Sequence, residues 1–562
     1  MTFEVTARDA GGRLGRLRVG EKTMVTPNIF VVVSAENNVV PPAELRETFG
    51  AQAVFTNAYL AYKDDRLRRG FEEAGVHSYL GFPGVVATDS GAFQYYMYRR
   101  DVEVTPEEIE AFQERIGADC PVILDQPVQL DDPWDVAKDK VELTLARARD
   151  NVGRRTRDDA CWFGPVHGTQ HLDLVRHSAR EMSKLDFGIY AIGGVVKTFL
   201  NYDFALDVDV ILAAKQCLTE GRPLHMFGLG LPQFFALAVA CGCDTFDSAA
   251  YVLYARDGRY FTLEGTRKLE QLEEFPCSCP QCSSSNPREV KALPAKERRE
   301  FLARHNLHVT FTELRAVRQA IREGTLWDLV AQRVRSHPRL LEAFERLRRY
   351  QGYFESKESS AKRRGIMWSG VETAHHPALV AAHRRLLARY SPPERKRVAL
   401  LVPEVDSPSV GSPAIAGWLK LLAALSPPSR GAVHVIYVNP LLGPVPHELR
   451  YTYPFSHVVF SHGYHAEVAE VSTERCVAYF EKNGCYTSVV AFRPSTYNSE
   501  VGRVLPLERH VVDDLVGRLS SSPGLVPRLR VVREPGELAG VLSEELERCS
   551  TQSNGGGERA GS

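Results

Sequence analysis

The sequence lacks the features that mark membrane-spanning, secreted and nucleotide-hydrolysing proteins. No apolar run reaches the length of about 18 residues that a membrane-spanning helix needs. The first residues carry neither the basic nor the apolar block of a signal peptide. No phosphate-binding loop and no internal repeat is found. The sequence therefore predicts a protein without a membrane segment and without a nucleotide-phosphate site.

A disulfide framework and an excess charge of either sign are also missing. The 11 cysteines are an odd number, and three of them share one short motif, which predicts a reducing, cytoplasmic location. The formal net charge is −1, so no global field draws the chain to nucleic acid. Hydrophobic residues at 44% and charged residues at 25% describe a soluble globular protein. A length of 562 residues predicts about three or four domains.

Positive charge is concentrated in one segment in spite of this overall balance. Between Gln332 and Arg364 the basic residues are Arg333, Arg335, Arg339, Arg346, Arg348, Arg349, Lys357, Lys362, Arg363 and Arg364. Such a run is typical of a solvated helix face, and equally of a surface that contacts phosphates. Composition does not decide between the two interpretations.

The motif Cys277-Ser-Cys279-Pro-Gln-Cys282, followed by His305, predicts a metal site. Three thiolates and one imidazole form the tetrahedral set that Zn²⁺ favours, and four protein ligands leave no position for water. We therefore expect one structural zinc ion, with His308 as the competing fourth ligand. The alternative is a cluster of buried cysteines with an unrelated histidine.

Short apolar runs alternate with longer helical patterns over the first ~330 residues. The predicted strands are Ala53–Thr56, Val85–Thr88, Val122–Leu124, Phe163–Val166, Ile189–Ile192, Leu224–Phe227 and Thr245–Phe246. Helical spacing is found between them, as in Pro106–Ile116 and Leu172–Leu185. This alternation predicts an α/β fold with a parallel sheet, either doubly wound or closed as a (β/α)8 barrel.

Polar residues or glycines follow nearly every predicted strand. They are Asp89, Asp125, His167, Gly193, Gly194, Gly228 and Asp247. A barrel places the carboxyl ends of all its strands around one mouth, whereas a doubly wound sheet concentrates its site near one switch point. We therefore predict a (β/α)8 TIM barrel over residues 1–350. The zinc motif, at 277–305, is expected in an insertion after the strand that ends near Asp247.

The rest of the chain differs in character. Residues 351–397 are basic and polar and are predicted to be a linker. A second, smaller α/β domain is predicted at 398–500, with strands at Val398–Val402, Val433–Val438, His457–Phe460 and Ser488–Phe492. Residues 501–549 are predicted to be a helical C-terminal region with one or two helices and a short strand, and 550–562 a disordered tail.

Three aspartates at one barrel mouth point to chemistry on a sugar or a base. A single aspartate at a strand end often only caps the next helix, but Asp89, Asp125 and Asp247 would converge. One carboxylate can attack an anomeric carbon, a second can handle the proton, and a third can accept N–H groups of a purine-like ring. Phe93 could stack on such a ring, and Gly193 with Gly194 would let backbone amides approach it.

Several motifs, in order, resemble the tRNA-guanine transglycosylases. They are Thr88-Asp-Ser-Gly-Ala-Phe-Gln94, Ala191-Ile-Gly-Gly194, His225-Met-Phe-Gly228, Thr245-Phe-Asp-Ser-Ala-Ala-Tyr251, the cysteine motif and His305-Asn-Leu. The segments Ala7-Arg-Asp-Ala-Gly-Gly-Arg-Leu-Gly15 and Arg335-Ser-His-Pro338 are similar to the archaeal branch. The resemblance covers roughly residues 1–350, and Leu449-Arg-Tyr-Thr-Tyr-Pro-Phe455 is similar to the domain that follows the barrel in archaeal members.

The resemblance implies an enzyme that exchanges guanine at position 15, in the D-arm of tRNA, for 7-cyano-7-deazaguanine (preQ0) in archaeosine biosynthesis. It implies Asp247 as the nucleophile on ribose C1′ and Asp89 as the general acid/base, although Asp89 is the nucleophile in some accounts of the family. It implies that Asp125, Gly193, Gly194, Phe93, Ser90 and His167 bind the substrate, and that Cys277, Cys279, Cys282 and His305 bind zinc. The target nucleotide would have to leave the folded tRNA, as in base-flipping enzymes.

Two departures from the family pattern leave alternatives open. Members usually carry Gln-Gly-Gly where this chain has His167-Gly-Thr169, which puts base selectivity in doubt. Residues 501–562 do not resemble the RNA-binding PUA domain of many archaeal members, so a separate PUA-type subunit is an expected partner, beside tRNA and a homodimer mate. The alternatives are exchange at another guanine, in the anticodon or in DNA, and a catalytically silent tRNA-binding paralogue.

Overall fold

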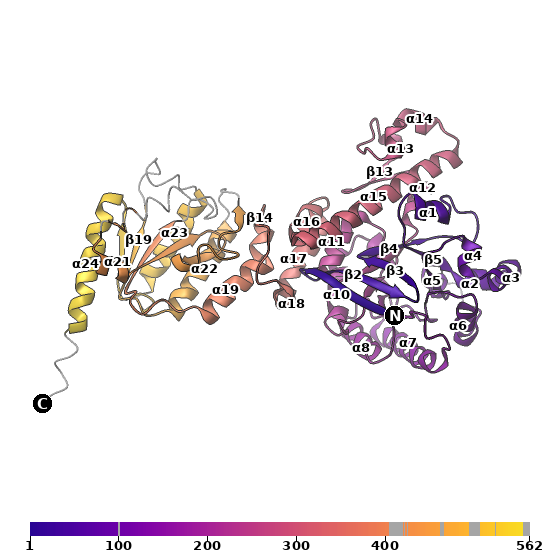
Figure 1. The fold of residues 1–562 in the computed structure, drawn as a ribbon, viewed down its shortest axis with the longest axis horizontal. Coiled ribbons are helices and arrows are strands. Elements are labelled where there is room, and N and C mark those ends of the chain that lie inside the picture. The colour runs from indigo at the N-terminus through magenta and orange to yellow at the C-terminus, as the bar shows by residue number, and fades with distance from the viewer. Residues whose placement is uncertain are drawn as a thin grey trace. The chain divides into compact units, whose positions relative to one another are not determined.

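The computed structural model describes residues 1–98, 102–403, 420, 422–423, 425–460, 466–493, 506–522 and 524–554. The chain forms two compact units, Met1–Lys357 and Glu358–Ser562, which are described separately (Figure 1). Among the described residues, no helix combines the length and apolar character needed to cross a bilayer.

The first unit contains the predicted (β/α)8 barrel. Eight parallel strands are hydrogen-bonded in the order β7-β6-β5-β4-β11-β10-β9-β8, and a bridge between Val122 and Phe163 joins the two ends of this series. The strands are β4 (Asn28–Val32), β5 (Ala53–Asn57), β6 (Val85–Asp89), β7 (Cys120–Pro121), β8 (Phe163–Val166), β9 (Ile189–Ile192), β10 (Leu224–Met226) and β11 (Thr245–Ser248). The barrel prediction is therefore confirmed.

The strand predicted at Val122–Leu124 lies earlier, at Cys120–Pro121. At Val122 a side chain supplements the strand ladder. Val122 N donates to the Thr88 carbonyl at 3.1 Å and also to Gln113 Oε1 at 3.2 Å, and Gln113 Nε2 donates to the Val122 carbonyl at 2.9 Å. The Gln113 side chain thus helps to satisfy the backbone of Val122 at the point where regular strand pairing ends.

Helices follow the strands and surround the barrel (Figure 1). They are α1 (Pro42–Glu47), α2 (Ala58–Lys63), α3 (Asp65–Ala74), α4 (Val76–Leu80), α5 (Ala92–Tyr98), α6 (Pro106–Arg115), α7 (Trp134–Arg154), α8 (Leu172–Met182), α9 (Val196–Leu200), α10 (Phe204–Lys215), α11 (Pro232–Cys241) and α12 (Ala250–Arg256). Local sequence sets the boundaries. Thr105 and Glu108, for example, form a capping box at the start of α6, with Pro106 in the first turn.

An antiparallel sheet that was not predicted contributes to the barrel core. It consists of β1 (Thr2–Asp9), β2 (Gly12–Val19) and β3 (Lys22–Thr26), and its Leu17, Val19 and Met24 join the cluster of buried residues inside the barrel. Arg13 of β2 forms a buried ion pair with Asp244, the residue before β11. This pair links the sheet to the amino end of a barrel strand.

The zinc motif follows β11, α12 and a hairpin, β12 (Arg259–Thr262) and β13 (Gly265–Lys268), as predicted for an insertion after the Asp247 strand. The region continues through η1 (Leu269–Gln271), α13 (Pro280–Ser283), α14 (Pro287–Ala292) and the long α15 (Ala295–Glu323). Figure 1 shows α13 and α14 beyond the barrel, beside one end of α15. The unit ends with α16 (Leu326–Val334), α17 (Pro338–Arg346), η2 (Leu347–Tyr350) and α18 (Gln351–Lys357).

The second unit is a smaller α/β structure. Its main sheet has the order β17-β16-β15-β19-β20, with β17 antiparallel, and β14 pairs with β18 separately. The elements are β14 (Ile366–Trp368), η3 (Val371–His375), α19 (Pro377–Arg389), β15 (Val398–Pro403), α21 (Pro427–Ala432), β16 (Val433–Asn439), β17 (Gly443–Pro446), η5 (His447–Leu449), β18 (Val458–Phe460), α22 (Ala466–Lys482), β19 (Ser488–Phe492), α23 (Pro506–Ser521), β20 (Leu529–Val532) and α24 (Pro535–Asn554).

Three boundaries differ from the sequence-based expectation. The second α/β domain does not end at residue 500, because β20, within the expected C-terminal region 501–549, pairs with β19 in its main sheet. The segment expected as a linker, 351–397, contains β14 and α19, because Ile366, Trp368 and Leu379 are buried in the second core. The tail expected to be disordered from residue 550 is helical through Asn554, at the end of α24. The remaining tail residues lie outside the described part of the chain.

Candidate active site and metal centre

Asp89 stands at the carboxyl end of β6, where burial controls its ionisation. Asn57, its register partner at the end of β5, donates through Nδ2 to Asp89 Oδ2 at 2.7 Å, and the Gly91 amide donates to Oδ1 at 3.3 Å. Burial, reinforced by the charges of Asp125 and Asp247 and opposed by hydrogen bonds from the backbone of Gly91 and Ser90, raises the pKa of Asp89 to about 7. Asp89 therefore keeps its proton up to about pH 7 and can act as an acid there.

Asp247, in β11, is held through one oxygen only. His225 Nε2 lies 3.0 Å from Asp247 Oδ1, and the Gly228 amide donates to the same atom at 2.9 Å. The side chain is 14% exposed. Among the described residues, none donates a hydrogen bond to Oδ2, which leaves this oxygen available to an electrophile.

Asp125 lies beyond β7 and pairs with the histidine that follows β8. His167 Nε2 lies 2.6 Å from Asp125 Oδ2, and both side chains are buried. His167 Nδ1 has no hydrogen-bond partner in the described part of the chain. Ser90, buried beside Asp89, donates to the Ile123 carbonyl at 2.8 Å and so ties the end of β6 to the segment leading to Asp125.

The two glycines after β9 are required by close contacts. A Cβ at Gly193 would lie 2.4 Å from His167 Cε1, and a Cβ at Gly194 would lie 2.7 Å from the Val128 carbonyl. Gly194 also has φ +77°, a conformation that favours glycine. The Gly193 amide donates to the Val166 carbonyl at 3.1 Å and is therefore already engaged.

Phe93 is on α5, which starts shortly after Asp89. Its side chain is 40% exposed, so an apolar ring reaches solvent close to a polar strand end. The predicted carboxylates, glycines and aromatic ring thus lie at the carboxyl ends of barrel strands or in the segments that follow them. The charges of Asp125 and Asp247 contribute to the raised pKa of Asp89, so the three carboxylates lie near one another.

Sequence reasoning missed two polar contacts of this site, Asn57 and His225. Asn57 directly follows the predicted strand Ala53–Thr56, so the rule that selected Asp89 could have found it. His225 lies inside a predicted strand, within a motif that was noted for its resemblance alone. Its register with Thr245, on the neighbouring strand, is visible only in the structure.

The four predicted zinc ligands come together beside α15. One ligand atom from each of Cys277, Cys279, Cys282 and His305 lies within 4.8 Å of the others. His305 Nδ1 is 3.5 Å from Cys279 Sγ and 3.3 Å from Cys282 Sγ. Ligands on a zinc tetrahedron are about 3.6 Å apart, so the cluster fits this ion.

The orientation of His305 and the position of His308 agree with this assignment. His305 Nε2 donates to the Phe261 carbonyl at 2.8 Å, which directs Nδ1 toward the thiols, as is usual for a metal-ligating histidine. The His308 ring instead packs against Phe49, with centroids 4.7 Å apart. His308 is therefore outside the ligand set.

Much of the basic segment after residue 332 is engaged in ion pairs. Arg333 contacts the buried Glu313 at 2.9 Å, and Arg346 contacts Asp209 at 2.7 Å. Arg339 pairs with Glu342 at 2.8 Å, and Lys357 pairs with Glu220. Arg333, Arg346 and Lys357 thus link their helices to other elements of the unit, and Arg339 pairs within α17 itself. These contacts favour the interpretation as an ordinary helix surface for the four residues.

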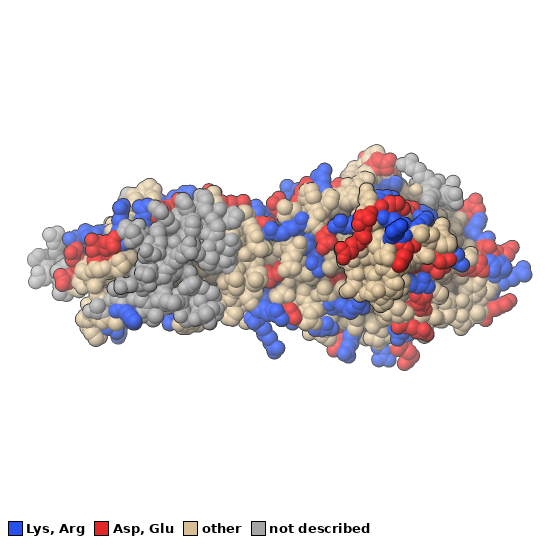
Figure 2. All heavy atoms as spheres, turned by 90° about the horizontal axis from the view of Figure 1, so that it is seen from above, with Lys and Arg blue, Asp and Glu red and all other residues tan. Residues whose placement is uncertain are grey.

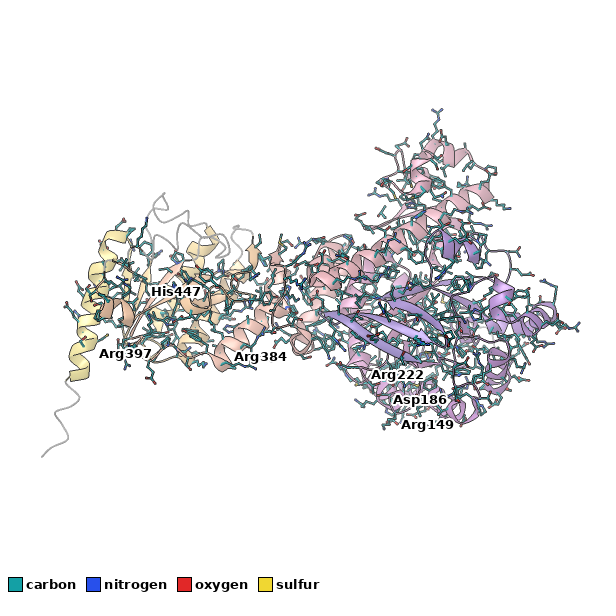
Figure 3. The ribbon with its side chains drawn as sticks, viewed as in Figure 1. Arg149, Asp186, Arg222, Arg384, Arg397 and His447 are labelled. Atoms are coloured by element: carbon teal, nitrogen blue, oxygen red, sulfur yellow. The ribbon has the colours of Figure 1, made fainter. Side chains whose placement is uncertain are left out.

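Pairing of opposite charges is also found elsewhere on the first unit. Asp186 accepts from Arg155 at 3.0 Å and from Arg222 at 3.1 Å, and Arg222 and Asp186 are labelled in Figure 3. In Figure 2, basic and acidic side chains are interspersed over this unit on the face shown. That face therefore carries no single basic field.

Comparison with known proteins assigns the barrel unit to one group. The family described as Queuine tRNA-ribosyltransferase matches residues 9–339. A tRNA-guanine(15) transglycosylase of Methanocaldococcus jannaschii is 44% identical over 393 residues, which are 69% of this chain and 60% of that protein. The tRNA-guanine(15) transglycosylase of Thermococcus kodakarensis is 44% identical over 68% of this chain and 65% of that protein. The one of Methanosarcina barkeri is 41% identical over 68% of this chain and 77% of that protein. The match thus spans less than two thirds of the first two relatives.

Proposed function

Because the chain belongs to the queuine tRNA-ribosyltransferase family, we propose that it exchanges guanine at position 15 of tRNA for 7-cyano-7-deazaguanine, a step in archaeosine biosynthesis. The target position is the one in the names of its relatives. The observation that best supports this reaction is that two carboxylates of the site, Asp89 and Asp247, have different environments. Asp89 has a raised pKa, whereas Asp247 keeps one oxygen clear of donors from the described residues.

In the first step of the proposed reaction, Asp247 Oδ2 attacks ribose C1′. A C1′–O bond forms while the C1′–N9 bond to guanine breaks, and the bonding electron pair moves to N9. Asp89, protonated near neutral pH, transfers its proton to N9, and neutral guanine leaves. The tRNA is then an ester of Asp247.

The second step reverses the first with a different base. The incoming 7-cyano-7-deazaguanine gives its N9 proton to the Asp89 carboxylate, and its nitrogen attacks C1′. The C1′–O bond breaks, the electron pair returns to Asp247, and Asp89 is protonated again. Two displacements at C1′ retain the configuration of the glycosidic bond and consume no further reactant.

Recognition of the base is proposed for the residues around Asp125. The Asp125 carboxylate can accept the N–H groups of a guanine-like edge, and the Gly194 amide can donate to its carbonyl. Phe93 can stack on the ring, and His167 and Ser90 support the Asp125 segment through their hydrogen bonds. Gly193 contributes because it has no Cβ, which leaves space for the His167 ring.

Zinc has a structural role in this proposal. Held by Cys277, Cys279, Cys282 and His305, the ion would supply a closed tetrahedral cross-link between the cysteine motif and α15. No step of the exchange passes through it.

The proposed partners follow from the family resemblance. They are the tRNA, a second copy of the chain as homodimer mate, and a PUA-type RNA-binding subunit. Entry of the target nucleotide requires that the D-arm open and the nucleotide leave the stack, at a cost of a few kcal/mol that contacts to the tRNA must offset. A cytoplasmic location is part of the proposal.

The deciding experiment is incorporation of radiolabelled 7-cyano-7-deazaguanine into an unmodified tRNA transcript, beside a transcript with adenine at position 15. Label in the first transcript alone supports both the reaction and its site. Label in both retains the chemistry but moves the target to another guanine. A folded, zinc-loaded protein that labels neither, with a PUA-type subunit added, would favour the silent paralogue.

A further inference from the structure

Asp247 is the end of a three-residue hydrogen-bond chain across two neighbouring strands. His225 of β10 and Thr245 of β11 are register partners, and His225 Nδ1 lies 3.0 Å from Thr245 Oγ1. The other ring nitrogen, Nε2, lies 3.0 Å from Asp247 Oδ1. Both nitrogens of this buried imidazole are therefore engaged.

The chemistry of the partners fixes the direction of every hydrogen bond. An ionised Asp247 can only accept, so His225 Nε2 must carry the hydrogen. Burial lowers the pKa of His225, which favours the neutral ring, so Nδ1 is an acceptor. The Thr245 hydroxyl has no other partner among the described residues and donates to Nδ1.

The surroundings hold the imidazole in place. The ring lies among Phe163 at 5.0 Å, Phe227 at 4.9 Å and Phe30 at 5.7 Å, measured between ring centroids. Gly228, whose amide also donates to Asp247 Oδ1, has φ +76°, and a Cβ there would lie 2.4 Å from Val196 Cγ2. Two donors on rigid elements thus converge on a single carboxylate oxygen.

We propose that His225, oriented by Thr245, is a positioning residue that fixes the Asp247 carboxylate so that Oδ2 faces the electrophilic carbon. This inference rests on the proposed base exchange and assigns a function to two residues within it. In the first step, the fixed rotamer presents Oδ2 at the attack position at no further entropic cost. In the second step, the donors on Oδ1 stabilise the negative charge that returns to Asp247 when the C1′–O bond breaks.

The test is the single-turnover release of guanine from tRNA, with enzyme in excess. Under these conditions a loss of folded enzyme lowers the amplitude, whereas a mispositioned carboxylate lowers the rate constant. His225→Leu removes the donor, His225→Gln keeps an N–H donor, and Thr245→Val removes only the hydroxyl. Thr56→Val is the matched control, since Thr56 is a buried barrel-strand threonine whose hydroxyl has no partner in the described structure.

We expect the rate constant to fall about 10- to 100-fold in H225L and about three- to tenfold in T245V, at unchanged amplitude. H225Q should retain most of the rate, T56V all of it, and KM for tRNA should stay within about twofold throughout. A wild-type rate constant in H225L overturns this inference and leaves the proposed function standing. If H225L does not fold, a wild-type rate constant in T245V overturns the inference instead. No guanine release by the wild type, assayed with a PUA-type subunit present, overturns the proposed function together with this inference.

Discussion

The side chains of Asn57 and Asp89 meet across the carboxyl ends of two parallel strands, where Asn57 Nδ2 donates to Asp89 Oδ2 at 2.7 Å. This hydrogen bond and those from the backbone favour the ionised carboxylate, whereas burial and two neighbouring carboxylates oppose it. The pKa of Asp89 is raised to about 7, because the effect of burial is larger than that of the hydrogen bonds. Asp89 therefore destabilises the folded state once the pH is high enough to ionise it.

Replacing Asp89 by asparagine should stabilise the protein in a pH-dependent manner. Below pH 3.8, the ordinary pKa of an aspartate, Asp89 is neutral in both the folded and the unfolded state. As the pH rises from there toward 7, only the unfolded chain ionises freely, so the stability contributed by the neutral group is lost through this window. We expect D89N to gain about 1–3 kcal/mol over wild type at pH 8, and little at pH 4.

Denaturant unfolding at the two pH values measures this effect. Asp139→Asn is the control, since Asp139 is exposed on α7 and its replacement removes the same charge. A gain in D139N equal to that in D89N would mean that net charge, rather than burial, is responsible. D89N should also exchange no base at a measurable rate, because an amide cannot supply the proton to N9.

Replacing Asp247 by asparagine should separate binding from chemistry. The amide preserves size and can still accept from His225 and Gly228 at one oxygen, so fold and tRNA affinity should be retained. An amide is a poor nucleophile, and we expect exchange to fall at least about 1,000-fold. Base incorporation and a tRNA mobility shift measure the two properties; appreciable turnover by D247N would exclude Asp247 as the nucleophile.

The fold was largely predictable because the barrel strands are short apolar runs followed by polar residues. Asn28–Val32 was missed because a single residue, Pro27, separates it from β3, so that Lys22–Val32 can be taken for one strand. The first sheet was missed because its residues were noted only for a resemblance. Its role in the core depends on contacts of Leu17 and Met24 with strands far along the chain.

The site was predictable in its carboxylates and metal ligands, but not in what orients them. Residue type and strand-end position selected Asp89, Asp125 and Asp247. The contacts of His225 with Asp247 depend on the register of adjacent strands, which no local pattern encodes. His305 and His308 could not be told apart by spacing, because both lie on α15 and only the structure shows that His308 packs against Phe49.

Removing zinc should destabilise the first unit, and two histidines one helical turn apart provide a matched test. His305→Ala deletes a ligand, so we expect less than one zinc per chain and a melting temperature lower by about 5–10 °C. His308→Ala, whose ring packs on Phe49, should retain stoichiometric zinc. Elemental analysis measures the zinc content and thermal unfolding measures the melting temperature. Full loss of zinc in His305→Ala with an unchanged melting temperature would refute the structural role.

The contact between Gly193 and His167 predicts a compensating pair of mutations. Gly193 has no positive φ, so an alanine there meets no backbone strain; the obstacle is the His167 ring, 2.4 Å from the added Cβ. Gly193→Ala should therefore cost about 1–3 kcal/mol of unfolding free energy in the wild-type background. In a His167→Ala background the space is open, and the same change should cost less than about 0.5 kcal/mol.

The double-mutant cycle of Gly193 and His167 also bears on base recognition. In G193A the ring must move, and with it the 2.6 Å contact from His167 Nε2 to Asp125, so KM for the incoming base should rise while KM for tRNA changes little. His167→Gln can keep a donor for Asp125 and should bind the base better than His167→Ala. Additive unfolding energies in the cycle would show that ring and glycine do not touch, and would remove the steric reason for glycine at this position.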